Sequence, residues 1–350
     1  MKRFFIAALL LALAGASIFQ LLRQRSAAPA VRSSSIVLIT IDTLRADRIG
    51  RGLTPALDEL AKSGRRFDNA RAAVPLTLPS HVTIMTGTLP TVHGVHDNGV
   101  VFDGARPTLA GVLRQAGYRT GAFVGAYVLD RRFGLAEGFE TYDDRVPRDP
   151  EAAARLEAER RGQEVVDAAI AWLQGVTGPF FLWVHLYDPH APYDPPESFK
   201  SGSAGSPYDG EVAYADAQVG RLLKALGDRS LLDDTLVAAA GDHGEGLGEH
   251  RELTHGMLAY DTTLRVPLIV AGRGVPQGVV TAPVSLADLV PSLVARLGRG
   301  GLSPGAGGVD LLAEPTVDRD IYAETRYPRA AGWHPLSVLA GERWKLVLSS

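Results

Sequence analysis

Short apolar runs recur along the chain. They carry no charged residue and are rich in β-branched, aromatic and alanine residues, which is typical of strands buried on both faces of a sheet. The expected strands are "IVLIT" at 36–40, "GAFVGA" at 121–126, "FFLWVHL" at 180–186, "TLVAAAG" at 235–241 and "VPLIVAG" at 266–272.

The stretches between these runs show helical spacing and helix-boundary signals. Thr54 is placed to cap a helix that Gly64 ends. The expected helices lie at 54–63, 108–117, 149–174 and 212–227. Because strands alternate with helices, the sequence predicts an α/β fold with a mainly parallel sheet and helices on both of its faces.

The N-terminal residues form a separate apolar segment. Lys2 and Arg3 precede an uncharged run from Phe4 to Leu22. The run reaches the roughly 18 residues of a membrane-spanning helix and exceeds the roughly 7 to 15 of a signal-peptide core. We therefore expect residues 1–25 to be an N-terminal signal or membrane anchor, with an uncleaved anchor favoured, and residues 26–35 to be a linker. The globular part would be exported to a bacterial periplasm and tethered to the inner membrane.

Composition narrows the classes of function and of site. The chain has 350 residues, of which 46% are hydrophobic and 21% charged, and its formal net charge is -3. This balance is that of a globular protein without the basic field that would attract nucleic acid. The chain has no cysteine, which excludes disulfides, thiolate metal sites and cysteine nucleophiles. Any metal ion must be bound through oxygen and nitrogen.

Ligand-type side chains follow three of the expected strands. In an open parallel sheet, ligands bind beyond the carboxyl ends of the strands, so polar residues there are the first candidates for a site. A single aspartate in such a position is usually a turn former or a helix cap, but three strand ends with carboxylate or imidazole groups together predict a metal site. These residues are Asp42, then His185, Asp188 and His190, and finally Asp242 and His243.

The stretch "VPLTLPSHVTIMTG" at 74–87 predicts the start of another helix. Thr77 is placed as its N-cap, and Pro79 lies in the first turn, where proline is tolerated. Free amide groups and the helix dipole favour an anion such as phosphate or sulfate at this end. A threonine hydroxyl held there beside a metal could ionise. Thr77 could therefore be both a cap and a nucleophile.

Six separate segments occur in one order along the chain. They are "IVLITIDTLRAD", "TLPSH" followed by "TGTLPTVHGVHDNG", "HLYDPHAPY", "GDHGEGLGEH", "THGMLAYDTTLRVPLIV" and "GERWKLV". In this order they resemble the sulfatase branch of the alkaline phosphatase superfamily, over roughly residues 36–350. The resemblance implies an alkaline phosphatase/sulfatase-like α/β fold. It places a catalytic domain at 36–300 and the start of a short or truncated C-terminal subdomain at 301–350.

The segment around Thr77 departs from the sulfatase pattern. Sulfatases carry Cys/Ser-x-Pro-Ser-Arg, in which the first residue is converted to formylglycine, whereas this chain has Thr77-Leu78-Pro79-Ser80-His81. "TLPSH" is instead similar to the Thr-Phe-Pro-Asn-His string of nucleotide pyrophosphatases/phosphodiesterases. In those enzymes an unmodified threonine is the nucleophile and a zinc ligand. The resemblance implies these roles for Thr77, a catalytic role for His81, and stabilisation of phosphoryl oxygens by Asn98 and the amides after Thr77.

Other departures replace family residues by histidine. Thr43 stands where a second Asp is usual, His243 where Asn is usual, and His255 where Lys is usual. Imidazole ligands move the preference from calcium toward zinc or manganese. The implied first metal site comprises Asp42, Thr77, Asp242 and His243. Asp188, His190 and His255 are candidates for a second ion or for catalytic groups that contact substrate, and one ion is favoured over two.

The resemblance implies a metal-dependent hydrolase of phosphate or sulfate esters. Thr77, as a metal-bound alkoxide, would form a covalent intermediate, and phosphate diesters or monoesters are favoured over sulfates. The alternatives are a phosphoethanolamine- or glycerol-phosphate-type transferase at the membrane and a catalytically silent, incomplete family member. The expected substrate is a small-molecule, lipid or glycan ester, and no nucleic-acid partner is expected. The sequence leaves the oligomeric state open.

Overall fold

A computed structural model of the chain describes residues 35–147, 158–200, 205–297, 307–313 and 319–349. The expected N-terminal signal or anchor at 1–25 and residues 26–34 of the linker expected at 26–35 lie outside these residues and stay predictions. Ser35, the last residue of that expected linker, is instead the first residue of a strand, Ser35–Ile41. Within the described ranges, no helix is both long enough and apolar enough to cross a membrane.

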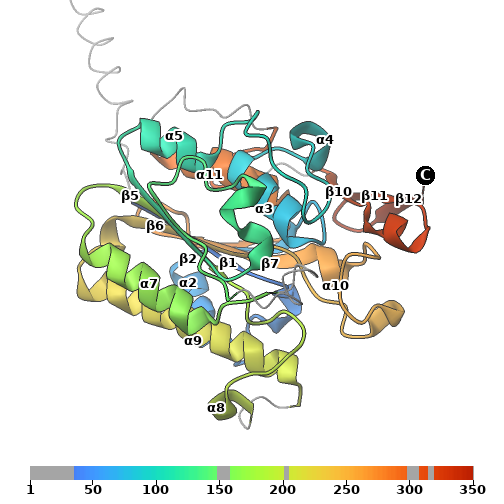
Figure 1. Ribbon diagram of the computed structural model, residues 1–350, viewed down its shortest axis with the longest axis horizontal. Coiled ribbons are helices and arrows are strands. Elements are labelled where there is room, and N and C mark those ends of the chain that lie inside the picture. Colours follow the sequence, from blue (N-terminus) through green and yellow to red (C-terminus); the bar gives the residue numbers. More distant parts are fainter. Residues whose placement is uncertain (1–34, 148–157, 201–204, 298–306, 314–318, 350) are drawn as a thin grey trace, which may run out of the picture.

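A large mixed sheet forms the centre of the molecule (Figure 1). Its strands, in spatial order, are β4 (Thr141–Asp143), β3 (Arg119–Val124), β5 (Phe180–Leu186), β1 (Ser35–Ile41), β6 (Thr235–Gly241), β7 (Arg265–Ala271), β2 (Gly64–Arg71) and β8 (Gly278–Val280), with β9 (Val284–Ser285) also paired to β2. All neighbouring pairs are parallel except those that β7 makes with β6 and β2. The sheet is therefore mainly parallel, as the sequence predicted.

Helices cover both faces of this sheet (Figure 1). One face carries α2 (Pro55–Ser63), α7 (Gly162–Gln174) and α9 (Pro207–Asp228), and the other carries α3 (Thr77–Thr86), α5 (Leu109–Gln115) and α11 (Leu289–Arg296). Shorter helices are α4 (Pro90–His93), α8 (Glu197–Lys200) and α10 (Asp261–Leu264).

Strand β1 separates two hydrophobic cores. Ile36 and Leu38 pack into the core beneath α3, α5 and α11, whereas Val37 and Ile39 pack into the core beneath α2, α7 and α9. Successive side chains of a strand point to opposite faces, so an unbroken apolar run is what a strand covered on both sides requires. This double burial explains why the run was recognisable in the sequence.

A second, three-stranded antiparallel sheet follows near the C-terminus. It consists of β10 (Ile321–Thr325), β11 (Leu336–Ala340) and β12 (Lys345–Ser349). It lies at one end of the large sheet, beside α4 and α10 (Figure 1). This sheet agrees with the expected short C-terminal subdomain.

Several elements differ from the sequence-based prediction, among them a strand and the start of a helix. A strand at Gly64–Arg71 was not expected, because its charged residues break the apolar pattern. The helix predicted at 149–174 begins only at Gly162, and residues 148–157 lie outside the described chain. Within 158–161, Glu159 instead forms a β-bridge with Ala126, and the Arg160 amide donates to the carbonyl oxygen of Gly125 at 2.8 Å.

Candidate active site

The carboxyl ends of three adjacent strands meet at one edge of the large sheet. β1 lies between β5 and β6, and its register places Thr40 beside His185 and Ile41 beside Gly241. Asp42 therefore leaves β1 at the level where Asp242 and His243 leave β6. Parallel pairing brings together residues that are far apart in the chain, so that the Thr43 amide donates to Asp242 Oδ1 across 199 positions.

Thr77 is the first residue of α3, and Leu76 is its N-cap, so the prediction that Thr77 caps the helix was wrong. The donors that a cap at Thr77 would need are missing. Pro79 has no N–H, and the amide of Ser80 donates to the carbonyl oxygen of Leu76 at 3.1 Å. The Thr77 hydroxyl instead donates to Asp42 Oδ2 at 3.2 Å and lies 3.4 Å from His243 Nε2.

Two buried carboxylates each leave one oxygen unpaired. Asp242 Oδ1 accepts the amides of Thr43 at 3.2 Å and His243 at 2.8 Å. Asp242 Oδ2 and Asp42 Oδ1 have no hydrogen-bond partner, although both residues are fully buried. Unpaired buried carboxylate oxygens are costly unless a cation neutralises them.

The ring of His243 presents a lone pair to these oxygens. Its Nδ1 lies 3.0 Å from the carbonyl oxygen of Gly244 and must donate, because a carbonyl oxygen only accepts. Nε2 then carries the lone pair, 3.5 Å from Asp42 Oδ1 and 3.7 Å from Asp242 Oδ2. Asp42, Asp242 and His243 form a group that could hold a metal ion. The unpaired oxygens, this lone pair and the Thr77 hydroxyl fit a divalent cation.

Burial and mutual repulsion separate the protonation of the two aspartates. Burial opposes ionisation of Asp42, but the hydrogen bond from His185 and the charges of His243 and His190 hold its pKa below the usual range. Burial and the charge of Asp42 raise the pKa of Asp242 well above its usual value. Burial and the nearby His255 lower the pKa of His243 to about 3. The neutral ring is the form that binds a metal.

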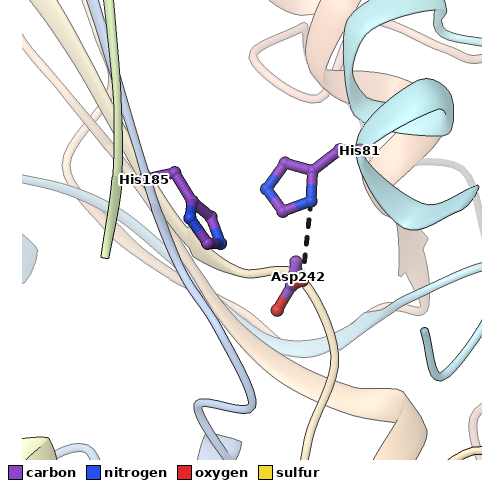
Figure 2. A group of neighbouring side chains, drawn as sticks. All are labelled: His81, His185 and Asp242. Atoms are coloured by element: carbon purple, nitrogen blue, oxygen red, sulfur yellow. Dashed lines mark ion pairs between the residues drawn. The ribbon is translucent and has the colours of Figure 1, made fainter. Parts of the chain in front are cut away.

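His81, His185 and Asp242 form a second cluster beside the first (Figure 2). His81 Nδ1 lies 2.7 Å from the carbonyl oxygen of Thr77 and 3.5 Å from Asp242 Oδ2, and its Nε2 lies 2.9 Å from Thr40 Oγ1. His185 Nδ1 accepts the amide of Gly125 at 3.4 Å, and its Nε2 lies 3.4 Å from Asp42 Oδ2. Protein groups engage both nitrogens of His81, which therefore orients Thr77. His185 Nε2 is buried without a hydrogen-bond partner, so His185, unlike His81, keeps a ring nitrogen available beside Asp42.

Two further predicted histidines form a row of rings with His243. The ring centroid of His255 lies 4.4 Å from that of His243 and 5.1 Å from that of His190. His190 Nδ1 lies 2.6 Å from the carbonyl oxygen of Ala191 and donates to it. His255 Nδ1 lies 3.1 Å from Glu245 Oε1. Burial lowers the pKa of His255, but the hydrogen bond and charge of Glu245 outweigh it and raise that pKa overall.

Asp188, a predicted candidate for a second ion, contacts a different part of the structure. Its Oδ1 accepts the amide of Gly162, the first residue of α7, at 3.0 Å. A Cβ atom added to Gly162 would lie 2.4 Å from Asp188 Oδ2, so the carboxylate is packed against this glycine. Burial raises the pKa of Asp188 to about 6. The carboxylate therefore satisfies the N-terminus of α7, a contact that its place beside His190 in the sequence did not indicate.

Asn98 contacts the helix that carries Thr77. Its Oδ1 accepts the amide of Leu78 at 3.0 Å, which leaves the Asn98 NH₂ group as a donor. The expectation that backbone amides after Thr77 stabilise an anion is wrong for residues 78–80. The Leu78 amide is engaged, Pro79 has none, and the Ser80 amide binds Leu76.

Sequence reasoning gave no definite role to two residues that the structure places in this site. His185 was among the strand-end candidates, but it lies within an apolar strand and was equally compatible with a core histidine. Glu245 follows His243 by two residues, but nothing in the sequence indicated its pairing with His255.

Comparisons with known proteins show the family of the chain. The family model described as "Sulfatase" matches residues 34–299. The choline-sulfatase of Rhizobium meliloti is 26% identical over 89% of this chain and 78% of its own length. Arylsulfatase A of Homo sapiens is 28% identical over 76% of this chain and 64% of its own length.

Solved structures share the fold. The phosphonate monoester hydrolase of Agrobacterium radiobacter superposes with a TM-score of 0.71 at 21% identity, covering 90% of this chain and 87% of that one. Because the family model covers most of the chain, the chain belongs to the sulfatase family, a family of ester hydrolases.

Proposed function

We propose that this protein hydrolyses phosphate esters, diesters or monoesters, in preference to sulfate esters, with the unmodified hydroxyl of Thr77 as its nucleophile. The observation that carries the proposal is the position of Thr77 Oγ1. It lies 3.2 Å from Asp42 Oδ2 and 3.4 Å from His243 Nε2, at the first residue of a helix. Other threonines of this helix direct their hydroxyls to its backbone, as Thr83 does to the carbonyl oxygen of Pro79 and Thr86 to that of Val82.

The proposed metal site comprises Asp42, Thr77, Asp242 and His243. One divalent cation bound there, zinc or manganese in preference to calcium, would act as a Lewis acid and lower the pKa of the hydroxyl. Support for this ligand set comes from the unpaired oxygens of Asp42 and Asp242 and from the lone pair of His243. Its single imidazole makes the set softer than an all-oxygen site.

The side chains of this site also suit the steps of the reaction. Asp42 Oδ2 accepts the Thr77 hydrogen and so orients a lone pair of the hydroxyl oxygen away from itself. Thr77 Oγ1 would pass that proton to Asp42 Oδ2 and attack the phosphorus atom, and the bond to the leaving alcohol would break as a covalent ester forms. Water would then hydrolyse this ester, and Thr77 would recover its proton. His81 holds the carbonyl of Thr77 and the side chain of Thr40, and thereby the start of α3.

Groups on the other side of the site can contact the transferred and leaving groups. The NH₂ group of Asn98 is available to the nonbridging oxygens. His255, whose pKa Glu245 raises, would donate a proton to the leaving alcohol, and His190 lies beside it. In this proposal both histidines contact substrate and do not bind a second ion.

The substrate proposed here is an ester of a small molecule, lipid or glycan. The matched relatives include a choline-sulfatase and a structure described in complex with D-glucosamine-2-N,6-O-disulfate. Those names support small and sugar esters as the class. The preference for phosphate depends on the threonine and on His81, which replace the sulfatase signature. Export and attachment to the inner membrane remain part of the proposal through residues 1–25.

The test compares turnover of p-nitrophenyl phosphate, bis-p-nitrophenyl phosphate and p-nitrophenyl sulfate after loading with zinc, manganese or calcium. We expect the phosphate esters to be cleaved fastest and the Thr77→Ala variant to lose activity. Undiminished turnover in Thr77→Ala would sink the nucleophile assignment. Turnover of the sulfate alone would overturn the preference for phosphorus, and equal activity after removal of all metal would reject the metal site.

A further inference from the structure

The connection between β10 and β11 exposes two aromatic side chains. The side chain of Trp333 is 59% exposed and that of Tyr327 is 39% exposed, whereas Trp183 in the core is fully buried. An exposed indole leaves a large apolar surface in water. Such side chains are enriched where a protein contacts a ligand.

This connection is held in one conformation by its own backbone. Residues Tyr327–Ala331 form a 3₁₀ helix, and the amide of Trp333 donates to the carbonyl oxygen of Pro328 at 3.0 Å. Gly332, with φ of 74°, donates to the carbonyl oxygen of Arg329 at 3.0 Å. Trp333 is therefore presented from a built turn, so a ligand that stacks on it does not have to order the backbone.

Hydrogen bonds tie β10, the strand that leads into this connection, to the active-site loops. The Thr325 hydroxyl donates to the carbonyl oxygen of Gly256 at 2.5 Å, and the Glu324 amide donates to that of Ala73 at 2.8 Å. A Cβ atom added to Gly256 would lie 3.1 Å from the ring of Tyr327 and 3.2 Å from Leu76. Leu76 directly precedes Thr77, and Gly256 directly follows His255. The aromatic connection is therefore a neighbour of the proposed site.

A pocket of about 440 Å³ lies against Trp333. Its lining includes Met257, Leu258, Pro328, His334 and Leu336, and none of the described residues that line it is Lys, Arg, Asp or Glu. Met257 follows His255 by two residues, so the two Cα atoms are at most about 7 Å apart. An uncharged, partly apolar lining beside an indole suits a flat, uncharged ring.

We propose that this Trp333 pocket is a subsite for the alcohol portion of the ester, and that it selects substrates in which that portion is an uncharged ring. The inference rests on the proposed function, because it places the ring beyond the leaving oxygen of the same reaction. The alcohol could carry either an aromatic ring or a pyranose ring, since both can stack on the face of the Trp333 indole. A charged or branched acyclic alcohol would gain nothing from Trp333.

The first test compares phenyl phosphate, glucose 6-phosphate and ethyl phosphate by phosphate release in wild type, Trp333→Ala and Trp344→Ala. Trp344 is the matched control, because it is 49% exposed and lies outside the pocket lining. We expect Trp333→Ala to lower kcat/KM about tenfold for at least one ring ester, mainly through KM, and to change ethyl phosphate less than twofold. An equal loss for ethyl phosphate, or the same loss in Trp344→Ala, would overturn the subsite.

A second measurement does not depend on turnover. Saturation-transfer NMR of phenol and of methyl glucoside reports ring binding to wild type and to both variants. We expect saturation of one of these rings to fall in Trp333→Ala alone, and the ring affected identifies the source. Unchanged saturation in Trp333→Ala would reject the subsite even for an active enzyme. Ring binding in a wild type that cleaves no ester would reject the proposed function and leave the subsite standing.

Discussion

The Thr77 side chain combines a reactive hydroxyl with a methyl group that restricts its rotamer. Its hydroxyl is held between Asp42 and His243, and the residue is buried. Thr77→Ser keeps the oxygen but frees χ1, so we expect turnover about tenfold below wild type. Thr77→Ala removes the nucleophile, and we expect a loss of about a thousandfold or more. Steady-state kinetics on p-nitrophenyl phosphate check both values, and equal activity in the two variants would show that the hydroxyl is not needed.

Glu245 acts through His255 in the proposed reaction. Its carboxylate raises the pKa of His255, so the protonated ring persists to higher pH than it would alone. Glu245→Gln removes that charge and lowers the pKa of His255, so the alkaline limb of the kcat/KM profile should move to lower pH. Above the limb we expect at least about a tenfold loss of kcat/KM, as for a lost charged hydrogen bond.

The pH profile also supplies the control for Glu245. A His255→Gln variant should lose the alkaline limb altogether. If Glu245→Gln leaves the limb where it is in wild type while activity falls, Glu245 has only a structural role.

The residue types of the site were predictable, but their pairings were not. Asp42, Asp242 and His243 were predicted because each follows a buried strand. The carboxyl ends of parallel strands meet at one edge of the sheet, so a residue at such an end can be recognised in the sequence as a candidate ligand. The contacts of His185 with Asp42 and of Glu245 with His255 depend on rotamers and loop paths that no local pattern encodes. The direction of the Thr77 hydroxyl likewise depends on where α3 begins, because the Ser80 amide donates to the carbonyl oxygen of Leu76 and not to Thr77.

Two loops, one after β1 and one after β6, supply most of the proposed metal ligands, and Arg45 joins them. Its NH1 donates to the carbonyl oxygen of Glu245 at 3.1 Å and to Glu249 Oε1 at 2.8 Å. Its other nitrogens bind Asp47 on its own loop at 2.9 and 3.0 Å. The guanidinium thereby fixes Asp42 relative to Asp242 and His243.

Arg45→Ala should therefore weaken metal binding without removing a ligand. We expect a loss of about ten- to a hundredfold in zinc or manganese affinity, as for other residues that orient ligands. Competition with a chelator measures it. Arg48→Ala is the matched control, because Arg48 pairs with Asp47 and Asp209, neither of which lies on the loop after β6. Equal affinities for wild type and Arg45→Ala would contradict the role of this link.

At the level of elements, the strands that could be predicted from the sequence are those buried on both faces. β1, β5 and β6 are buried throughout and largely apolar because helices cover both of their faces. β2 carries three arginines and is half-buried only at Arg66 and Asp68, so its register with β7 was not visible in composition. The antiparallel direction of β7 has no sequence signal, since its residues would suit either direction equally.

For the whole molecule, the proposed site is a source of instability until a cation is bound. Asp42 and Asp242 are fully buried near one another, and burial together with Asp42 raises the pKa of Asp242. When the pKa of a carboxyl group is higher in the folded than in the unfolded state, the free energy of unfolding falls as pH rises through the pKa of the folded state. At neutral pH the metal-free protein should therefore be strained at this site, and metal binding should raise its melting temperature.

Asp242→Asn separates this stability cost from function. In this variant, Asn Oδ1 can still accept the amides of Thr43 and His243. Its NH₂ group takes the place of Asp242 Oδ2, which lies 3.7 Å from the lone pair of His243 Nε2. We expect the melting temperature of the metal-free variant to rise by about 2 °C or more, since one buried charge is removed. The metal-induced rise should disappear together with activity. Differential scanning calorimetry with and without zinc measures both effects, and a metal-free variant less stable than wild type would mean that the Asp242 charge is already compensated within the protein.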